Sequence, residues 1–393
     1  MTGNLCPDHS TISDFRKLNG KALSGIFREF NLLCLELDLF GRELVAIDGT
    51  FIKAVNSKAR SFTKTKLIKL IAAIDKAVTA YLEQLESVDV LEDHSDSQTT
   101  SKAELQEKLA KIKERKATLE SHLQQCEESP TGQVNLTDPD SVQLCKGDKR
   151  TVGYNVQSAV DAKHHLVAAV EVTQDGNDMH QLNNMAQKAK EGMGLEADAK
   201  IKAAADKGYG TGSELATCES NNTETYVSIQ KRKSEGNGLY NQKDFIYDAN
   251  SDCYQCPAGA VLRRGADREC GGTAHRIYQN TGACKDCSLK GQCTKGAFRR
   301  IQISEHQEAI ERAKKRLSKA PEMVIKRHAT AEHPFGTIKD RHGRHDLLCT
   351  GKELAEAETG MSFWAYNFTR AINIKGVRVL IEAIRSRKGP AIA

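Results

Sequence analysis

The sequence ELVAIDGT, residues 43–50, sets a carboxylate directly after an unbroken apolar run. Leu44 to Ile47 are apolar without alternation, which predicts a strand buried on both faces. Asp48 follows at once, and Gly49 allows the backbone to turn or to approach a neighbour closely. We therefore expect Asp48 to end a core strand and to belong to a functional site.

Two further acids have related settings. Asp206 ends the apolar run IKAAAD at 201–206, and Glu332 lies in ATAEHPFGTIK at 329–339, which has helical character. Two such aspartates and a glutamate can hold two Mg²⁺ ions, because Mg²⁺ prefers carboxylate oxygens as ligands. Two ions held about 3.5–4 Å apart promote the cleavage of a phosphodiester bond. In that arrangement Asp48 bridges the ions, while Asp206 and Glu332 each complete one side. The alternative for each aspartate is an ordinary cap or turn residue.

Composition sets broad limits on the protein. The chain has 393 residues and twelve cysteines, and its length predicts two or three structural units. Its net charge of +5 favours a polyanionic partner such as DNA. Many cytoplasmic enzymes are equally basic, so charge alone does not decide the partner. No 18-residue apolar run or signal segment occurs, so we expect a cytoplasmic protein without membrane contact. In that compartment cysteines serve as metal ligands before they form disulfides.

The order of elements predicts the fold class. Strand patterns at 152–160 and 166–172 predict an antiparallel pair, followed by a helix at 180–193. The strand before Asp206, a helix at 213–218 and a strand at 226–229 come next. Together with residues 43–50, this order predicts an α/β protein with a ribonuclease-H-like core, a mixed sheet flanked by helices.

Two segments are expected to interrupt this core. Residues 63–128 carry two apolar helix faces, separated by an acidic segment at 89–101 that we expect to be flexible. This pattern predicts a helical-hairpin insertion whose two helices pack on each other. The alternative is a coiled coil that binds a partner. Residues 231–298 are polar and rich in Gly and Cys, and predict a small zinc-ribbon-like insertion. The remaining parts are a helical region at 1–42, core at 43–62 and 129–230, C-terminal helices at 299–380 and a frayed tail at 381–393.

The cysteine spacing in the second insertion is the strongest local motif. Cys253-x2-Cys256 and Cys284-x2-Cys287 are followed six residues later by Cys293. Thiolates two residues apart can present two sulfurs to one tetrahedral zinc ion, and two such pairs close the site. We expect a structural zinc, with free reduced thiols as the alternative. A catalytic zinc is not expected, because no His or carboxylate replaces a ligand within the motif.

Basic residues surround the third acid. A phosphate-binding face beside a metal site fits DNA cleavage, although ordinary solvated helix faces also explain such runs. The residues are Arg312, Lys314, Lys315, Arg316, Lys319, Lys326, Arg327, Lys339, Arg341 and Arg344.

Five motifs in this chain together resemble the bacterial insertion-sequence transposases of the DDE class. They are LVAIDGT (44–50), NLTDPDS (135–141), GYNVQ (153–157), ADKGY (205–209) and EHPFGTIK (332–339), in the family's order across nearly all of residues 5–375. The resemblance implies a ribonuclease-H-like core with Asp48, Asp206 and Glu332 as the catalytic triad, served by Mg²⁺ or Mn²⁺. It also implies cutting of DNA at transposon ends and joining of the 3′ hydroxyls to target DNA, by a homodimer that holds two ends.

The resemblance also assigns residues around the third acid and among the cysteines. In the family the glutamate belongs to a Tyr-Arg-Glu-Lys signature, and Lys339, two helical turns after Glu332, matches its lysine and is expected to hold a DNA phosphate. Arg327 precedes Glu332 by five residues, whereas the usual spacing falls on His328, and the tyrosine is absent. Among the thiols the family pattern favours Cys256, Cys284, Cys287 and Cys293 as zinc ligands, with Cys253 extra.

The start of the chain differs from the family. Its members ordinarily carry a longer helical region before the segment that resembles PDHSTISDFR at 7–16. We therefore expect an N-terminally short transposase that lacks part of the DNA-end recognition region. This feature motivates an alternative function, a catalytically silent fragment that regulates by binding DNA or a full-length transposase. A metal-dependent nuclease without a joining step is a further alternative.

Overall fold

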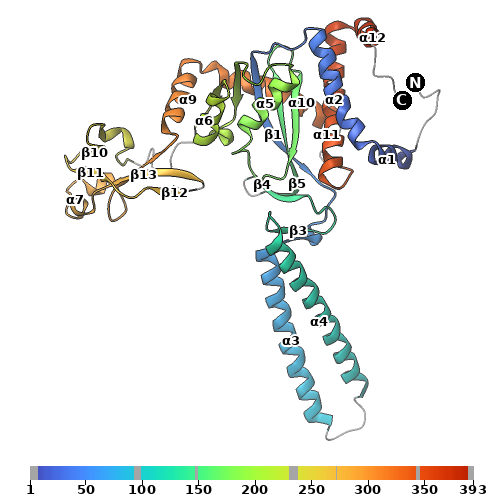
Figure 1. Ribbon diagram of the computed structural model, residues 1–393. Coiled ribbons are helices and arrows are strands. Elements are labelled where there is room, and N and C mark those ends of the chain that lie inside the picture. Colours follow the sequence, from blue (N-terminus) through green and yellow to red (C-terminus); the bar gives the residue numbers. More distant parts are fainter. Residues whose placement is uncertain are drawn as a thin grey trace.

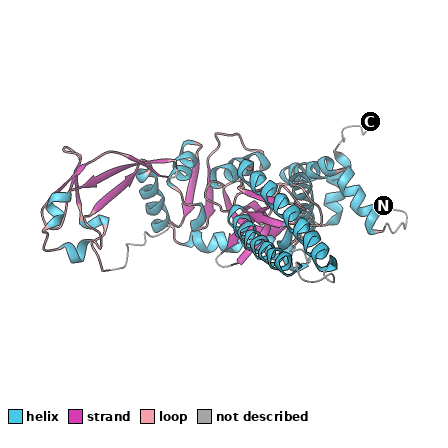
Figure 2. Cartoon of the chain, turned by 90° about the horizontal axis from the view of Figure 1, so that it is seen from below, coloured by secondary structure: helices cyan, strands magenta, loops and turns pink. Residues whose placement is uncertain are grey.

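The computed structural model describes residues 8–92, 99–146, 149–229, 238–270, 272–341 and 346–387. A central body of sheet and helices carries two projecting parts, a long pair of helices and a small β-rich unit (Figure 1). In the view from below, the β-rich unit lies at the opposite end of the molecule from both termini (Figure 2). No helix within the described ranges has the length and apolar character needed to cross a membrane.

The central sheet is mixed, as the sequence predicts. β1 (Leu44–Lys53) pairs antiparallel with β5 (Lys149–Asp161) on one side and parallel with β7 (Ile201–Ala205) on the other. β8 (Thr223–Val227) continues the sheet parallel to β7. The far edge of the long strand β5 pairs antiparallel with β6 (Val167–Thr173) and with β4 (Val142–Lys146). The order outward from β1 is therefore β5 then β6 on one side, and β7 then β8 on the other.

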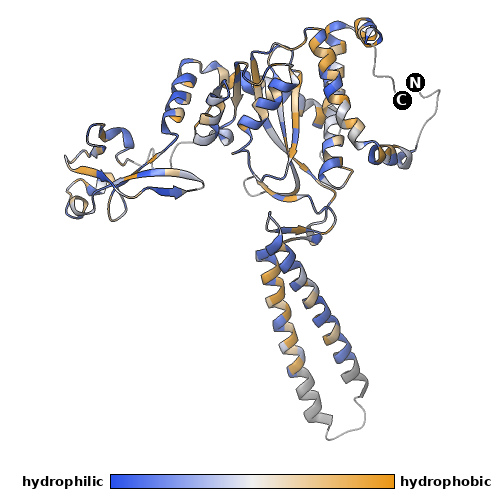
Figure 3. Cartoon of the chain, in the orientation of Figure 1, coloured by the Kyte–Doolittle hydropathy of each residue, from blue (hydrophilic) through white to orange (hydrophobic). Residues whose placement is uncertain are grey.

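Helices cover both faces of this sheet. On one face Val45 and Ile47 are fully buried in a large apolar cluster with α2 (Gly20–Glu36), α5 (Leu182–Gly192) and α6 (Gly212–Ser220). On the other face a second cluster joins the sheet to α10 (Glu322–Arg341) and α11 (Lys352–Lys375) through Phe335, Ile338 and Phe363. Apolar residues concentrate in this central body, in the sheet and in α2 and α11 (Figure 3).

The predicted helical hairpin is present as two long helices. α3 (Lys64–Glu92) and α4 (Thr99–Glu128) pack on each other, and the short pair β2 (Ser61–Thr63) and β3 (Gln133–Asn135) closes their base. Phe62, Leu67 and Leu119 are buried there. The helices extend into the segment expected to be flexible at 89–101, of which residues 93–98 lie outside the described residues. The helical periodicity therefore continues further than the acidic composition indicates.

The β-rich unit has its own sheet and core. Its strands are β9 (Ile246–Asp248), β10 (Cys253–Gln255), β11 (Val261–Arg264), β12 (Arg268–Cys270), β13 (Thr273–Gln279) and β14 (Arg300–Ser304), and its short helices are α7 (Thr281–Lys285) and α8 (Lys290–Cys293). β14 pairs with β13, and Ile301 is buried against Tyr278. The unit thus continues to Ser304, six residues beyond the expected boundary at 298, because β14 supplies part of its core.

Two other boundaries differ from the sequence prediction. The strand expected at 226–229 is β8 at 223–227, where the inward positions alternate as Thr223, Thr225 and Val227, so the polar threonines conceal its start. The first part of the tail expected at 381–393 is instead helical, since α12 (Val377–Ser386) buries Leu380 in the main cluster, and residues 388–393 lie outside the described residues. The remaining helices are α1 (His9–Leu18) and α9 (Gln307–Lys319).

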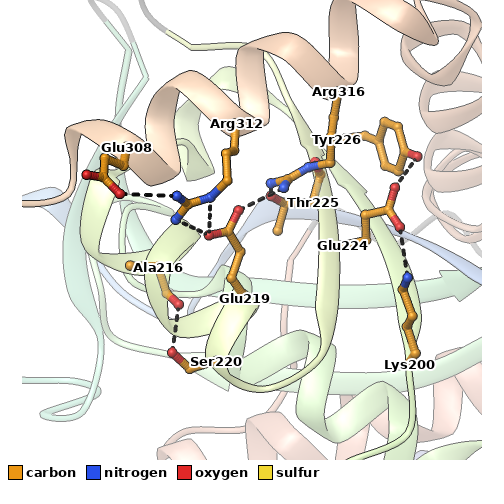
Figure 4. A network of polar contacts seen from close by, with 10 residues as sticks. All are labelled: Lys200, Ala216, Glu219, Ser220, Glu224, Thr225, Tyr226, Glu308, Arg312 and Arg316. Carbon is orange, nitrogen blue, oxygen red and sulfur yellow. Dashed lines mark hydrogen bonds and ion pairs between the residues drawn. The ribbon is translucent and has the colours of Figure 1, made fainter.

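A network of charged side chains fixes α9 to the core (Figure 4). Arg312 and Arg316 of α9 donate to the carboxylate of Glu219 on α6 at 2.8 and 2.7 Å, and Arg316 also donates to the hydroxyl of Thr225 at 3.0 Å. Burial alone would raise the pKa of Glu219, but the hydrogen bonds from the two arginines hold it below its ordinary value. These two arginines, expected to face DNA, are therefore committed to ion pairs within the protein.

We predict that Glu219→Ala lowers the free energy of unfolding by about 1–3 kcal/mol at pH 7, because two arginines lose a charged acceptor. The pKa of Glu219 is depressed, so the stabilisation is present above the ordinary glutamate pKa and is lost as the pH falls through the folded-state value. Urea unfolding at pH 7 and at pH 3 measures both effects.

The matched control is Glu308→Ala. The carboxylate of Glu308 lies 3.4 Å from Arg312, and the Glu308 side chain is 89% exposed. Its effect should be within the error of the measurement. Equal losses for the two variants would contradict the assigned role of Glu219.

Candidate active site

Strand register brings the first two acids together. Ile47 of β1 lies opposite Ala205 of β7, and the two strands are parallel, so Asp48 and Asp206 follow at adjacent positions. Asp48 accepts a hydrogen bond from the Gly49 amide at 2.9 Å. Asp206 caps a short 3-10 helix and accepts from the Lys207 amide at 2.7 Å.

The prediction that Asp48 ends its strand is wrong. β1 continues to Lys53, because Gly49 to Lys53 pair with Gln157 to Gly153 of β5. Asp48 lies where the neighbouring strand β7 stops, and its side chain remains 24% exposed there. The end of β7, and not the end of β1, therefore opens the site beside Asp48.

Helix α10 lies across this position and packs on β1, β5, β7 and β8. Arg327, only 6% exposed, places Nη1 3.3 Å from Oδ2 of Asp48. Lys339 donates from Nζ to the hydroxyl of Thr50 at 2.6 Å. Asp48 and Thr50 are two residues apart on one face of β1, so both basic residues of α10 approach that face.

The third acid lies on the exposed side of the same helix. Glu332 has a side chain 64% exposed, and its Oε1 is 2.7 Å from Nδ1 of His328. Nε2 of His328 is 3.0 Å from Nη2 of Arg327, so a neutral His328 protonated on Nδ1 can donate to Glu332 and accept from Arg327. Polar contacts therefore run from Asp48 through Arg327 and His328 to Glu332.

The carboxylates of Asp48, Asp206 and Glu332 are ligands that suit a hard divalent cation. In their present positions these side chains do not surround a cation site. Within the described residues, Asp206 and Glu332 each keep one carboxylate oxygen that accepts no hydrogen bond. Such oxygens are the ligands that Mg²⁺ prefers. Across the described ranges, no three His, Cys, Asp or Glu side chains converge on a common metal position. Glu332 in particular is turned towards His328.

The electrostatics of Asp48 favour a bound cation. Burial raises the pKa of its carboxyl, Arg327 and the Gly49 amide lower it, and the negative charges of Asp178 and Asp206 raise it further, for a net upward shift. An ionised Asp48 is therefore costly in the folded chain, since desolvation and two neighbouring carboxylates outweigh the pairing with Arg327. A divalent cation would offset that cost.

The sequence interpretation missed Asp178. It lies in the loop between β6 and α5, and its Oδ1 accepts hydrogen bonds from the side-chain amides of Asn155 and Gln157 at 2.9 and 2.7 Å. The one available signal is in the motif GYNVQ, where polar residues occupy alternate positions of a core strand and are fully buried. Buried amides require partners. Nothing in the loop sequence itself distinguishes Asp178 from its neighbours.

The predicted DNA-binding residues have different settings. Arg327 is buried against Asp48 and is not exposed on the surface. This geometry therefore favours a contact with Asp48 over the expected contact with DNA. Lys339 is held at Thr50 beside the acids. Arg341 is the last residue of α10, and Arg344 lies outside the described residues.

Four of the motif cysteines share one small cavity in the β-rich unit. Cys256, Cys284, Cys287 and Cys293 line a space of about 30 Å³, while Cys253 lies on β10 outside this lining. Burial raises the pKa of Cys293, the Arg299 charge lowers it, and the three other thiols raise it further. These four cysteines and Cys253 are all free thiols. This donor set suits tetrahedral zinc, although no three thiols converge in the described structure.

Comparison with known proteins gives a family. The family model described as "Transposase DDE domain" matches residues 129–368, more than half of the chain. A search of the curated proteins finds no match. Among solved structures, a piggyBac transposase synaptic complex with hairpin DNA, determined by cryo-EM, is similar with 8% sequence identity and a TM-score of 0.20. That match covers 65% of this chain and 56% of the other.

We predict that Asp48→Asn does not destabilise the metal-free protein at pH 7, and that it raises its melting temperature. The pKa of Asp48 is raised, so the folded state favours the neutral form. The contribution of Asp48 to the stability of the native chain is fully present below the ordinary aspartate pKa. It is lost as the pH rises through the pKa of Asp48 in the folded state. The advantage of Asp48→Asn should therefore vanish below about pH 4. Thermal unfolding in EDTA across this pH range measures it.

The comparison variants are Arg327→Ala and Asp346→Asn. Arg327→Ala should lose about 1–3 kcal/mol, because a desolvated carboxylate keeps its charge without its partner. Asp346→Asn breaks an exposed ion pair with Lys53 and should change little. A large loss of stability in Asp48→Asn at neutral pH would show that pairing with Arg327 outweighs burial and like-charge repulsion.

Proposed function

The chain belongs to the transposases with a DDE domain, an enzyme class of metal-dependent DNA cleavage and strand transfer, and on that premise we propose that Asp48, Asp206 and Glu332 form its catalytic site. The single observation that carries this proposal is the parallel register of β1 and β7, which sets Asp48 beside Asp206 under α10, the helix that carries Glu332. The proposed reaction cuts DNA at the ends of an insertion sequence and joins the 3′ hydroxyls to target DNA.

A ribonuclease-H-like core is part of this proposal. The strand order supports it, with three antiparallel neighbours β6, β5 and β1 followed by two strands, β7 and β8, parallel to β1. Helices on both faces and an acid beside the central strand fit the same arrangement. The proposed division gives this core residues 43–62, 129–230 and 305–386, with insertions at 63–128 and 231–304.

The proposed mechanism assigns each residue a task. Asp48 and Asp206 would hold Mg²⁺ or Mn²⁺, with Glu332 completing the set after leaving His328. When bound, two such ions lower the pKa of the attacking hydroxyl and stabilise the leaving oxygen of an in-line displacement. Arg327 orients Asp48 and opposes the rise in its pKa through the contact at 3.3 Å. Lys339, held at Thr50, offers a positive charge to a DNA phosphate beside the acids.

His328 gives the third acid two positions in this mechanism. Glu332 is four residues after His328 on α10 and is paired with it here. It is also seven residues, about two helical turns, before Lys339, so both project from the side of the helix that reaches Thr50. We propose that Glu332 leaves His328 and turns its carboxylate towards Asp48 when a cation binds.

The partners follow from the same reaction. The substrate is DNA, as element ends and as target, and a homodimer would hold two ends together. The proposed location is the cytoplasm. The β-rich unit is proposed to hold a structural Zn²⁺ through Cys256, Cys284, Cys287 and Cys293, a role supported by their shared cavity.

Strand cleavage tests the catalytic proposal. Native protein with Mg²⁺ or Mn²⁺ should nick supercoiled DNA, and Asp48→Ala or Glu332→Ala should lower the rate at least about 100-fold, because each removes a metal ligand. Glu322→Ala, an exposed acid in the first turn of the same helix, is the matched control and should retain the native rate.

Two results would overturn this function. Cleavage that survives both substitutions would place the chemistry elsewhere. DNA binding without any cleavage by the native chain would favour the regulatory alternative.

Zinc content tests the role of the cysteines. The purified native chain should contain about one zinc per molecule, because the four thiols around one cavity make a closed four-sulfur site. Cys284→Ser should lose the zinc together with the stability of the β-rich unit, whereas Cys253→Ser should keep it. Elemental analysis by mass spectrometry gives the stoichiometry. A native chain without zinc, or equal loss in the two variants, would contradict this assignment.

A further inference from the structure

A fourth carboxylate lies between the segments that carry the two proposed metal-binding aspartates. Gly49 directly follows Asp48, and a Cβ at Gly49 would be 2.9 Å from Oδ1 of Asp178. Gly208 is two residues after Asp206, and a Cβ there would be 3.7 Å from Oδ2 of Asp178. A side chain at Gly49 would therefore collide with the carboxylate of Asp178, and one at Gly208 would be in ordinary contact with it, so Asp178 lies against both segments.

Two buried amides hold Asp178 in one orientation. Asn155 and Gln157 are fully buried on β5, and both donate to Oδ1 of Asp178. The orientation of Gln157 is itself fixed, because its Oε1 accepts from the hydroxyl of Tyr209 and its Nε2 also donates to Asn155 at 3.0 Å. A fully connected network of this kind is costly to disrupt, since each buried group that lost its partner would remain desolvated.

This network satisfies one oxygen of Asp178 and leaves the other available. Among the described residues, Oδ2 accepts no hydrogen bond, and no ion pair reaches Asp178. The amides and the tyrosine are neutral, so they orient the carboxylate without compensating its charge. The charges of Asp178 and Asp206 both act on Asp48, which is paired with Arg327, although no three carboxylates of the described residues converge on one metal position as placed. A purely structural role would be served equally by asparagine.

Resting on the proposed metal-dependent function, we propose that Asp178 is a further oxygen donor, through Oδ2, to the divalent cation held by Asp48 and Asp206. Asn155, Gln157 and Tyr209 are positioning residues that keep Oδ2 turned to the cation. Mg²⁺ takes six oxygen ligands, and two aspartates leave several of these places to other carboxylates, to water and to substrate. The acid therefore raises the affinity of the site for metal before DNA arrives.

The decisive variant is Asp178→Asn. The asparagine Oδ1 can still accept from Asn155 and Gln157, so the buried network is kept, while the charge and the second oxygen donor are lost. Isothermal titration of the full chain with Mn²⁺, without DNA, should show a loss of affinity of at least about tenfold, as is typical when a group supporting a metal site is removed. In EDTA the melting temperature should equal or exceed that of the native chain, because like-charge repulsion falls.

The matched control is Asp175→Asn, which removes the same charge three residues earlier in the same loop, where the carboxylate accepts from Gln181. Its affinity for Mn²⁺ should stay within twofold of native. If Asp178→Asn fails to fold, as judged by circular dichroism, Asp178→Ser gives the same readout.

Asp206→Asn separates this inference from the function on which it rests. Weakened Mn²⁺ binding in Asp206→Asn but native binding in Asp178→Asn would overturn the role of Asp178 alone. A native chain that binds no Mn²⁺, or an Asp206→Asn variant with native affinity, would overturn the metal site as a whole. Loss of affinity in both variants, with Asp175→Asn unaffected, is the result expected.

Discussion

The parallel pairing of β1 with β7 is the constraint on which the site depends. These strands are separated by more than 140 residues, which include the helical hairpin and the antiparallel strands β5 and β6. Their register sets Ile47 opposite Ala205, and a shift by one residue would turn Asp48 into the apolar cluster that now holds Ile47. Burial of Val45 and Ile47 on one face therefore fixes the position of the carboxylate on the other face.

The helix α10 adds charge control to this geometry. Its apolar residues Phe335 and Ile338 pack on the sheet, and this packing holds Arg327 at Asp48 and Lys339 at Thr50. One helix thus provides the acid, a charge that compensates the buried aspartate and a lysine at the edge of the site. Glu332, paired with His328 on the exposed side, is the one of the three acids that would have to reorient to join the proposed site.

Much of this arrangement could be predicted from the sequence. The unbroken apolar runs before Asp48 and Asp206, and the alternation in residues 152–160, predict the mixed sheet that the structure has, and the DDE transposase family is confirmed. Less could be predicted where polar residues are buried in the core or paired within the protein. The threonines of β8 conceal the start of that strand, and Asp178 is recognisable only through the tertiary contacts of Asn155 and Gln157. Likewise, Arg312 and Arg316 cannot be told from DNA-binding residues until Glu219 is seen beside them.

The central claim is that Asp48 and Asp206 share a divalent cation. Crystals of the full chain soaked in manganese chloride, with anomalous diffraction data to locate the metal, test this claim without reference to activity. We predict an anomalous peak within about 2.1 Å of carboxylate oxygens from both residues, the distance typical of a hard cation of this size. Manganese bound elsewhere, with neither carboxylate in contact, would contradict it.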